Sequence, residues 1–391
     1  MTLELADTLP EDGFAGALVG RVWRPGQPDG PSPVAVREGA VIDLSRHAAT
    51  SAALCARTDA VDLVRNAEGE RLGGVEEILR NSSVDRRDPA APWFLAPCDL
   101  QAVKACGVTF VKSMLERVIE EQAKGDPDQA AEIRTAIADE VGQSISRIVP
   151  GSAEAVRVKA LLVERGLWSQ YLEVGIGPDA EVFTKSQPMA AVGTGAEIGI
   201  LETSTWNNPE PEVVLVIAAD GRTVGATLGN DVNLRDVEGR SALLLGKAKD
   251  NRASAAVGPF IRLFDDGFGI DDVRRMTIRL QVEGADDGFR LDGLSSLAEI
   301  SRDPLDLAAQ ACSAANHYPD GLVLYTGTMF APTDDRDAPG QGFTHHLGDI
   351  VSISTPLLGT LRNRVNHCHL LPRWQFGAGA LMANLSARGL L

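Results

Sequence analysis

Short runs of apolar and β-branched residues, each ended by glycine, asparagine or proline, fill the chain from residue 171 onward. Runs of this length and composition predict strands. The predicted strands cover residues 181–183, 196–200, 212–217, 223–228, 277–282, 321–325 and 350–354. Helical spacing interrupts them at 236–246, 296–300 and 304–315. Many short strands with irregular connections indicate an α+β, β-rich fold, a mixed β-sandwich or roll, rather than a doubly wound sheet.

The first hundred residues show the same β-rich texture on a smaller scale. Loops rich in proline and glycine separate their apolar runs. These runs predict strands at 19–23, 33–36 and 40–44. Residues 80–92 are rich in charge, asparagine, serine and proline, which suits a linker. We therefore expect a small β-rich N-terminal domain over residues 1–92 and a larger domain over residues 93–391.

Helical spacing of apolar residues marks the segment between these two β-rich regions. A strand is predicted at 103–110, and the apolar residues that follow recur three and four positions apart. This spacing predicts a helix over 111–124, which Gly125 ends. Similar patterns predict helices over 129–141 and 153–165.

The composition is that of a globular protein with an acidic surface. The chain has 391 residues, of which 44% are hydrophobic, and a formal net charge of −17. A nucleic-acid partner is not expected, because binding a phosphate backbone normally needs a basic face. The longest strongly apolar stretch, residues 213–219, is far too short to span a bilayer, so no membrane partner is expected either. An anionic substrate would then need a local positive feature, such as a metal or a lysine.

Cysteine spacing and the N-terminal sequence bear on the cellular compartment. The five cysteines are widely spaced and form no CxxC pair, so neither a disulfide framework nor a zinc site is indicated. The N-terminus lacks the basic-then-apolar layout of a signal peptide. We therefore expect a protein of the reducing cytoplasm. No glycine-rich phosphate-binding motif follows a predicted strand, so nucleotide binding has no motif support.

Two glutamates stand at the entry of the most apolar predicted strand. Residues i and i+2 of a strand point to the same face, so Glu210 and Glu212 would lie side by side. Adjacent carboxylates beside an apolar run repel each other and need a cation, a shared proton or water. A pair of this kind on its own is more often a solvated strand entry.

A third carboxylate follows the next predicted strand, after a turn at Asp220-Gly221. If the two strands form a hairpin, Asp231 lies near the end of the strand that carries Glu210 and Glu212. Three carboxylate ligands suit a hard ion such as Mg²⁺, which usually keeps some positions open for substrate. The alternative is that Gly-Asn-Asp231 serves only the turn.

Several other polar residues could be either functional or ordinary surface residues. Lys185 and Lys249 lie near the predicted acidic cluster in sequence order, although lysines in such places are usually surface charges. Gly327-Thr328 follows a predicted strand and could offer a backbone N–H and a hydroxyl to a carboxylate. His345 and His346 lie in a loop that could close over a substrate, but histidines in such loops are more often exposed bystanders.

Taken in order, these motifs resemble the fumarylacetoacetate hydrolase superfamily over about residues 100–391. The matching residues are Phe183 and Lys185, Glu210 and Glu212, Asp231 with Arg235 and Asp236, Lys249, and Gly327 with Thr328. As an ordered set they are far more specific than any one motif. The resemblance implies a mixed β-sandwich roll that assembles as a homo-oligomer, a dimer or a dimer of dimers.

The resemblance also implies roles for these residues. Glu210, Glu212 and Asp231 would bind Mg²⁺, or Mn²⁺ in its place, and the metal would chelate a 2-oxo acid. Lys249 would orient or polarise that substrate. Thr328 would contact the substrate carboxylate, with Gly327 and Arg235 as further substrate-binding residues.

One position departs from the pattern of the hydrolytic members. Those enzymes carry a histidine and a glutamate three residues apart, and the pair activates water. Here the glutamate is present as Glu116, but Ser113 occupies the position of the histidine. A lone glutamate over a chelated 2-oxo acid suits removal of the C3 proton, because the metal polarises the C2 carbonyl and stabilises an enolate. With a hydroxyl at C4, loss of water follows, with Ser113 as a substrate contact.

The longer texture, including Asn207-Asn-Pro-Glu210 and Gly340-Gln-Gly-Phe-Thr-His345, resembles the sugar-acid dehydratases of this superfamily. The predicted function is therefore a magnesium-dependent lyase that converts a 2-keto-3-deoxy-D-pentonate, derived from D-xylonate or D-arabinonate, to 2-oxoglutarate semialdehyde. A second proton-transfer group is needed, and Lys249, Lys185 and a metal-bound water are candidates. The alternatives are a hydrolase that cleaves a C–C bond of a diketo acid, and a non-catalytic protein that binds 2-oxo acids.

Overall fold

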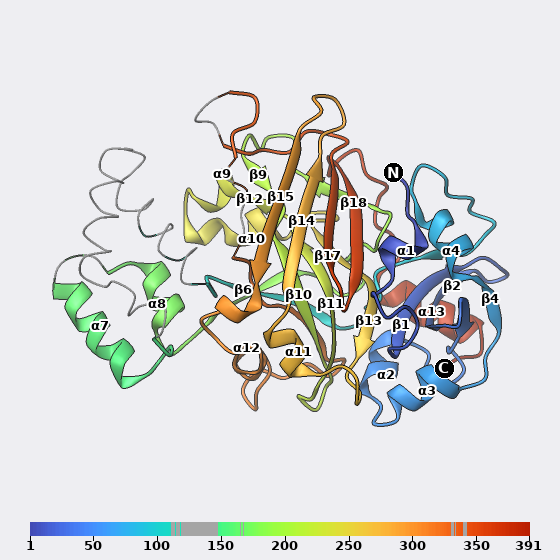
Figure 1. Cartoon of the computed structure of the whole chain (residues 1–391). Helices are drawn as coiled ribbons and strands as arrows, with labels where there is room; N and C mark the ends of the chain where they lie inside the picture. The colour runs from blue at the N-terminus through green and yellow to red at the C-terminus, as the bar shows by residue number, and fades with distance from the viewer. Residues whose placement is uncertain are drawn as a thin grey trace.

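The computed structural model describes residues 1–110, 114, 118, 148–164, 166, 168–329, 332, 334–338 and 342–391. Strands dominate these residues and form three sheets, of eleven, five and two strands. Parallel and antiparallel pairs occur together in the two larger sheets. The predicted β-rich mixed sandwich or roll is confirmed (Figure 1).

The eleven-stranded sheet is built from strands of the whole chain. Its order is β4-β3-β2-β1-β13-β11-β10-β16-β6-β7, and β5 pairs with β1 beside this path. Among its described strands β16 and β6 make the one parallel pair. The strands are β1 (Leu18–Arg24), β2 (Gly30–Arg37), β3 (Ala40–Asp43), β4 (Arg71–Gly74), β5 (Trp93–Phe94), β6 (Ala102–Gly107), β7 (Glu181–Ser186), β10 (Pro211–Ile217), β11 (Thr223–Asp231), β13 (Ala255–Leu263) and β16 (Leu322–Tyr325).

The five-stranded sheet lies in front of β10 and β11 in Figure 1, and it alternates buried and exposed residues along β14 and β15. Its order is β15-β14-β17-β18-β8. The strands are β8 (Glu197–Ile200), β14 (Thr277–Glu283), β15 (Arg290–Ser296), β17 (Ile350–Thr355) and β18 (Gly359–His367), and a separate ribbon pairs β9 (Asn207–Asn208) with β12 (Asn233–Leu234).

Strand β10 is buried on both faces. Val213 and Leu215 join the hydrophobic cluster between the two large sheets, which also holds Leu280 of β14. Val214 and Val216 point the other way, into a second cluster. This double burial explains why the apolar residues of β10 form a continuous run instead of alternating with polar ones.

The N-terminal strands extend the large sheet instead of forming a sheet of their own. Strand β1 pairs with β13, so that Val19 lies opposite Ile261. The C-terminal helix α13 (Ala378–Ala387) packs on β2 of the same region, where Asn384 Nδ2 donates to Asp29 O over 2.6 Å. The domain boundary at residue 92 stays a prediction, but the hydrogen-bonded sheet does not end there.

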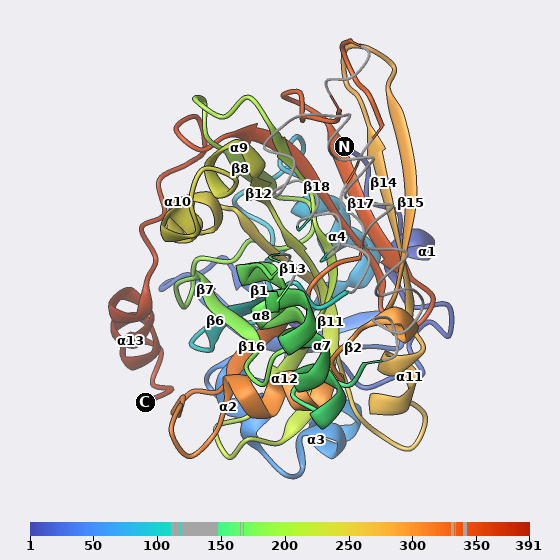
Figure 2. The same cartoon turned by 90° about the vertical axis from the view of Figure 1, so that its left-hand side faces the viewer.

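Short helices surround the sheets. They are α1 (Leu5–Thr8), α2 (Ser51–Ala56), α3 (Ala60–Asn66), α4 (Val75–Ser82), α7 (Ala153–Glu164), α8 (Gln170–Ile176), α9 (Arg235–Glu238), α10 (Leu245–Lys249), α11 (Ile270–Arg274) and α12 (Pro304–Ala311), with 3-10 turns at Ala242–Leu244 and Leu297–Glu299. In Figure 2, α7 and α8 face the viewer below α9 and α10. Among the described residues no helix has the length and apolar character to cross a membrane.

Several local predictions differ from the structure. The predicted linker 80–92 begins inside α4, and the single helix predicted over 236–246 is broken after α9 by Gly239. Strand β13 was not predicted, because its Gly258-Pro259 pair interrupts the apolar run. Of the predicted helix 111–124, the described residues Met114 and Val118 are helical and buried. The predicted helix 129–141 lies outside the described residues, as do Ser113 and Glu116.

Candidate metal centre

The β10–β11 hairpin brings the three predicted carboxylates together. The strands pair with Glu212 opposite Gly229, and the Asp231 N–H donates to Glu210 O over 3.0 Å. Glu210, Glu212 and Asp231 each offer a carboxylate oxygen, and these oxygens lie within 4.8 Å of one another. All three residues are buried, with relative exposures of 8%, 1% and 1%. The hairpin that the sequence predicted is therefore the element that assembles the cluster.

The donor set fits a hard divalent cation. With metal–oxygen distances of about 2.0–2.1 Å, two ligands of an octahedral Mg²⁺ lie about 3 Å apart when adjacent and about 4 Å apart when opposite. The separations in the cluster require only small side-chain movements to reach these values. Three all-oxygen protein ligands also leave coordination positions for water or substrate.

The raised pKa values of two of these carboxylates also indicate a cation site. Burial, followed by the charges of Asp231 and Glu210, raises the pKa of Glu212 well above its ordinary value. Burial also raises the pKa of Glu210, against the opposing effect of Lys249. Buried carboxylates this close together resist ionising at the same time. A divalent cation would remove that conflict.

Lys249 lies directly against the carboxylates, at the end of α10. Its Nζ is 2.5 Å from Glu210 Oε2 and 3.2 Å from Asp231 Oδ2. Burial acts to lower the pKa of Lys249, but the neighbouring carboxylates outweigh it and raise the pKa above its ordinary value. Lys249 is therefore a charged ammonium at the site and not a surface residue.

Lys185 of β7 supports the cluster from the other side and is fully buried. Its Nζ lies 2.7 Å from Asp231 Oδ1 and donates to Lys249 O over 2.6 Å and to Val232 O over 3.0 Å. An ammonium has three protons, and four oxygens surround this one, since Ser254 Oγ also lies 3.3 Å from Nζ. The geometry suits a residue that positions Asp231 and the Lys249 backbone.

The turn after β16 completes the cluster. The Gly327 N–H donates to Glu212 Oε2 over 2.6 Å, and Thr328, half-buried, follows at once. Thr326 attaches this turn to β10, because its N–H and its hydroxyl both donate to Val213 O, over 3.1 and 3.0 Å. The predicted Gly-Thr turn thus meets the carboxylate cluster through a backbone donor.

Gly327→Ala is expected to weaken both stability and metal binding. Gly327 has a φ of +91°, and a Cβ there would lie 2.0 Å from Thr109 Oγ1. The turn would have to move, and the N–H bond to Glu212 would be lost. Loss of a hydrogen bond that supports a metal ligand typically lowers metal affinity about 10–100-fold. Mg²⁺ titration calorimetry and thermal unfolding measure the two effects.

Gly221→Ala is the matched control, because Gly221 has a φ of +86° and open space around its Cβ position. It should lose about 1 kcal/mol of stability from backbone strain and keep its metal affinity. Equal metal affinity in both variants would contradict the role of the Gly327 N–H.

The remaining predicted site residue, Arg235, lies at the edge of this arrangement. It is buried, and its guanidinium carbon lies 4.3 Å from the centre of the Trp206 ring. Asn233 contacts the cluster directly, because its Nδ2 donates to Glu210 Oε1 over 3.0 Å. Asn230 also contributes, since its Oδ1 accepts the Glu210 N–H over 3.1 Å. Neither asparagine was predicted as a site residue, although both flank Asp231 in the sequence Asn-Asp-Val-Asn.

The two loop histidines differ in their surroundings. His345 is buried, contrary to the expectation of an exposed bystander, and its Nδ1 lies 3.2 Å from Asp349 Oδ2. Asp349 is in turn held by Arg336, over 2.6 and 3.0 Å. His346 is partly exposed and lies 3.0 Å from Asp337. The network thus links Arg336, His345 and Asp349 among the described residues before β17.

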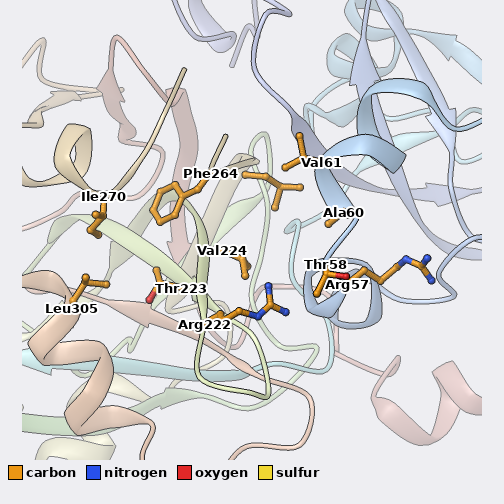
Figure 3. A pocket seen from close by; sticks show the side chains of 11 residues that line it. Arg57, Thr58, Ala60, Val61, Arg222, Thr223, Val224, Phe264, Ile270 and Leu305 are labelled. Atoms are coloured by element: carbon orange, nitrogen blue, oxygen red, sulfur yellow. The ribbon is translucent and has the colours of Figure 1, made fainter. Parts of the chain in front are cut away.

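A cavity of about 440 Å³ lies at the opposite end of the hairpin, where β11 begins (Figure 3). Helix α3 and strands β11 and β13 contribute its walls. Val61, Val224, Phe264, Ile270 and Leu305 give it an apolar lining, and Arg57 and Arg222 lie at its edge. Asp59 and Asp220 pair with these two arginines. The cavity therefore belongs to the junction of the N-terminal region with the large sheet and not to the metal centre.

Known proteins share both sequence and fold with this chain. A probable 2-keto-3-deoxyxylonate dehydratase of Haloferax volcanii is 31% identical over 202 residues, 52% of this chain and 65% of the relative. The 2-dehydro-3-deoxy-D-arabinonate dehydratase of Saccharolobus solfataricus is 30% identical over 184 residues, 46% of this chain and 57% of the relative. The similarity thus spans less than two thirds of either relative's length.

The fold likeness extends further than the sequence similarity. A solved structure of a 2-keto-3-deoxy-D-arabinonate dehydratase, complexed with magnesium and 2,5-dioxopentanoate, superimposes with a TM-score of 0.61 at 20% identity. The match covers 90% of this chain and 99% of that one. At this level of identity the likeness shows a shared fold.

A family model settles the relationship. The model for the C-terminal part of fumarylacetoacetate (FAA) hydrolase matches residues 167–366. This range contains the three carboxylates, Lys185, Lys249 and the Gly327-Thr328 turn. The chain therefore belongs to the fumarylacetoacetate hydrolase family.

Proposed function

We propose that this chain is a magnesium-dependent lyase that removes water from a 2-keto-3-deoxy-D-pentonate to give 2-oxoglutarate semialdehyde. The observation that carries the proposal is the convergence of three buried carboxylates with two buried lysines on one hairpin end. The two curated relatives are dehydratases of 2-keto-3-deoxy sugar acids by name, which supports the same reaction here.

The charge of the cluster favours a cation. When ionised, Glu210, Glu212 and Asp231 carry three negative charges, which exceed the two positive charges of the paired lysines. Glu238 adds a further negative charge that acts on Glu210 and Lys249. A divalent cation would offset this excess, because uncompensated charges are costly in a buried site.

The metal, held by Glu210, Glu212 and Asp231, would supply a Lewis acid that polarises the C2 carbonyl of a chelated 2-oxo acid. Mn²⁺ has the same ligand preferences and could take its place. The Gly327 N–H keeps Glu212 in place, and Lys185 does the same for Asp231.

We assign the remaining steps to residues of this chain. Glu116 acts as the general base that takes the C3 proton, and the C4–O bond then breaks with the loss of water. Loss of a C5 proton and tautomerisation give the aldehyde. Lys249 and Lys185 both stay candidates for the second proton-transfer group: Lys249 faces the carboxylates directly, whereas burial lowers the pKa of Lys185. Thr328 binds the substrate carboxylate, with Ser113 and Arg235 as further contacts.

The test is incubation of the purified protein with Mg²⁺ and either a 2-keto-3-deoxy-D-pentonate or an acylpyruvate. The dehydratase should release the semialdehyde from the first, and chelation by EDTA should stop the reaction. Release of pyruvate from the acylpyruvate, without any semialdehyde from the sugar acid, would favour the C–C hydrolase instead. The homo-oligomer also stays a prediction, which light scattering would measure.

A further inference from the structure

Strands β6 and β16 lie side by side, and the carboxyl end of β16 leads to the metal centre. The two strands are parallel, with Tyr325 opposite Ala105. After β16 the chain makes the Gly327 turn that holds Glu212. After β6 it continues to Thr109. The two segments therefore leave the sheet at the same edge.

Thr109 joins these two segments beyond the end of the strand ladder. It is 1% exposed, and its hydroxyl donates to Thr326 O over 2.8 Å. On its other side, Thr109 O accepts from both the N–H and the hydroxyl of Ser301, each over 2.8 Å. Its side chain also fills the space beside Gly327, where a Cβ would lie 2.0 Å from Thr109 Oγ1.

The backbone before Thr109 is strained. Val108 has a φ of +54°, although a β-branched residue strongly disfavours the left-handed region. Such a conformation persists only where the surrounding contacts hold it, and strained residues of this kind gather at functional sites. The contacts of Thr109 with Thr326 and Ser301 hold the chain on one side of Val108, and the pairing of Gly107 with Glu181 holds it on the other.

We propose that Thr109 is a positioning residue of the metal centre. Its hydroxyl fixes the Thr326-Gly327 turn against the end of β6, and the fixed turn holds the Gly327 N–H on Glu212. This inference rests on the metal site of the proposed function. The hydroxyl acts on that site indirectly, through the Gly327 N–H and Glu212.

Thr109→Val tests the inference because it removes the hydroxyl and keeps the side-chain volume. Mg²⁺ affinity, measured by calorimetry, should fall about 10-fold or more, as expected when a metal ligand loses its support. Turnover at saturating Mg²⁺ should fall as well. Thr109→Ser keeps the hydroxyl and should restore Mg²⁺ affinity to within about 3-fold of the parent, by the same reasoning.

Thr8→Val is the matched control. Thr8 is also buried, and its hydroxyl also donates to a backbone carbonyl, Glu4 O, over 2.8 Å. It lies in α1, away from the metal centre (Figure 1). The two valine variants should lower the melting temperature by similar amounts, and only Thr109→Val should change Mg²⁺ affinity. Parent-like Mg²⁺ affinity in Thr109→Val would overturn the inference.

Thr109→Ala gives a second test if Thr109→Val fails to fold. It removes the same hydroxyl without placing a methyl group against Thr326 O. A drop in Mg²⁺ affinity with an unchanged fold would support the inference, and parent-like affinity would overturn it. If the parent protein itself does not bind Mg²⁺, the proposed function is wrong. If the parent binds Mg²⁺ and the Thr109 variant binds it equally well, only this inference is wrong.

Discussion

Glu212→Gln is expected to abolish magnesium binding and to make the metal-free protein more stable. The change removes one of three charged ligands, so Mg²⁺ affinity should fall about 100-fold or more. The glutamine oxygen can still accept the Gly327 N–H, and the side-chain volume is unchanged. The buried repulsion with Asp231 and Glu210, which raises the pKa of Glu212, is relieved. Thermal unfolding in EDTA and in Mg²⁺ measures both effects.

The effect of Glu212→Gln has a defined pH dependence. In the folded, metal-free protein the pKa of Glu212 lies above its ordinary value of 4.5. The folded state therefore binds this proton more tightly than the unfolded state, and the resulting stability is lost as pH rises through the folded pKa. The melting temperature of the variant in EDTA should exceed that of the parent by a margin that grows with pH from about 4.5 upward. Mg²⁺ should close this gap by stabilising the parent alone.

Glu283→Gln, an exposed change on β14, provides the control for Glu212→Gln. It should leave the stabilisation by Mg²⁺ and the pH profile as in the parent. If Glu212→Gln were stabilised by Mg²⁺ as strongly as the parent, the three carboxylates would not be the metal site.

Glu116→Gln is expected to stop turnover and to leave ligand binding intact. A general base typically contributes about 10²–10⁴-fold to the rate, so kcat should fall by roughly that factor. The dissociation constants of Mg²⁺ and of pyruvate should stay within about 2-fold of the parent, since the proposed function assigns metal binding and carboxylate binding to other residues. Steady-state kinetics and calorimetry on the same preparation check the two statements.

Glu121→Gln is a suitable control because it lies on the same predicted helix, on a different face. It should keep parental turnover. A non-catalytic 2-oxo-acid binding protein predicts a different outcome, in which Glu116→Gln behaves as the parent does and neither shows turnover. If Glu116→Gln lost both turnover and the binding of Mg²⁺ or pyruvate, Glu116 would support the structure or the metal site and would not be the general base.

Much of the metal centre was predictable because it depends on one local element. The side-chain period of two along a strand puts Glu210 and Glu212 on one face, and the Asp220-Gly221 turn brings Asp231 back beside them. Neither statement needs a distant partner. The apolar run over residues 212–217 likewise predicted a strand, and the two hydrophobic clusters show that both faces of β10 are buried.

The roles of the lysines depended on tertiary structure. The sequence offered Lys185 and Lys249 as equivalent candidates for proton transfer. Only the packing of β7 against the segment after β11 engages Lys185 with Asp231, Val232 O and Lys249 O. Lys249 instead faces the carboxylates themselves. Because these contacts join residues far apart in the chain, no local pattern could separate the two lysines.

The extent of the large sheet was also decided by long-range pairing. Local strand patterns in the first hundred residues suggested a separate β-rich region, and the strands themselves are where the sequence placed them. Their union with the rest of the sheet depends on β1 meeting β13, which is more than two hundred residues away. The Gly327 N–H on Glu212 has the same origin. The sequence thus determined strands, turns and the carboxylate triad, since these follow from neighbouring residues, whereas strand order and the support of each ligand came from contacts that only the folded chain creates.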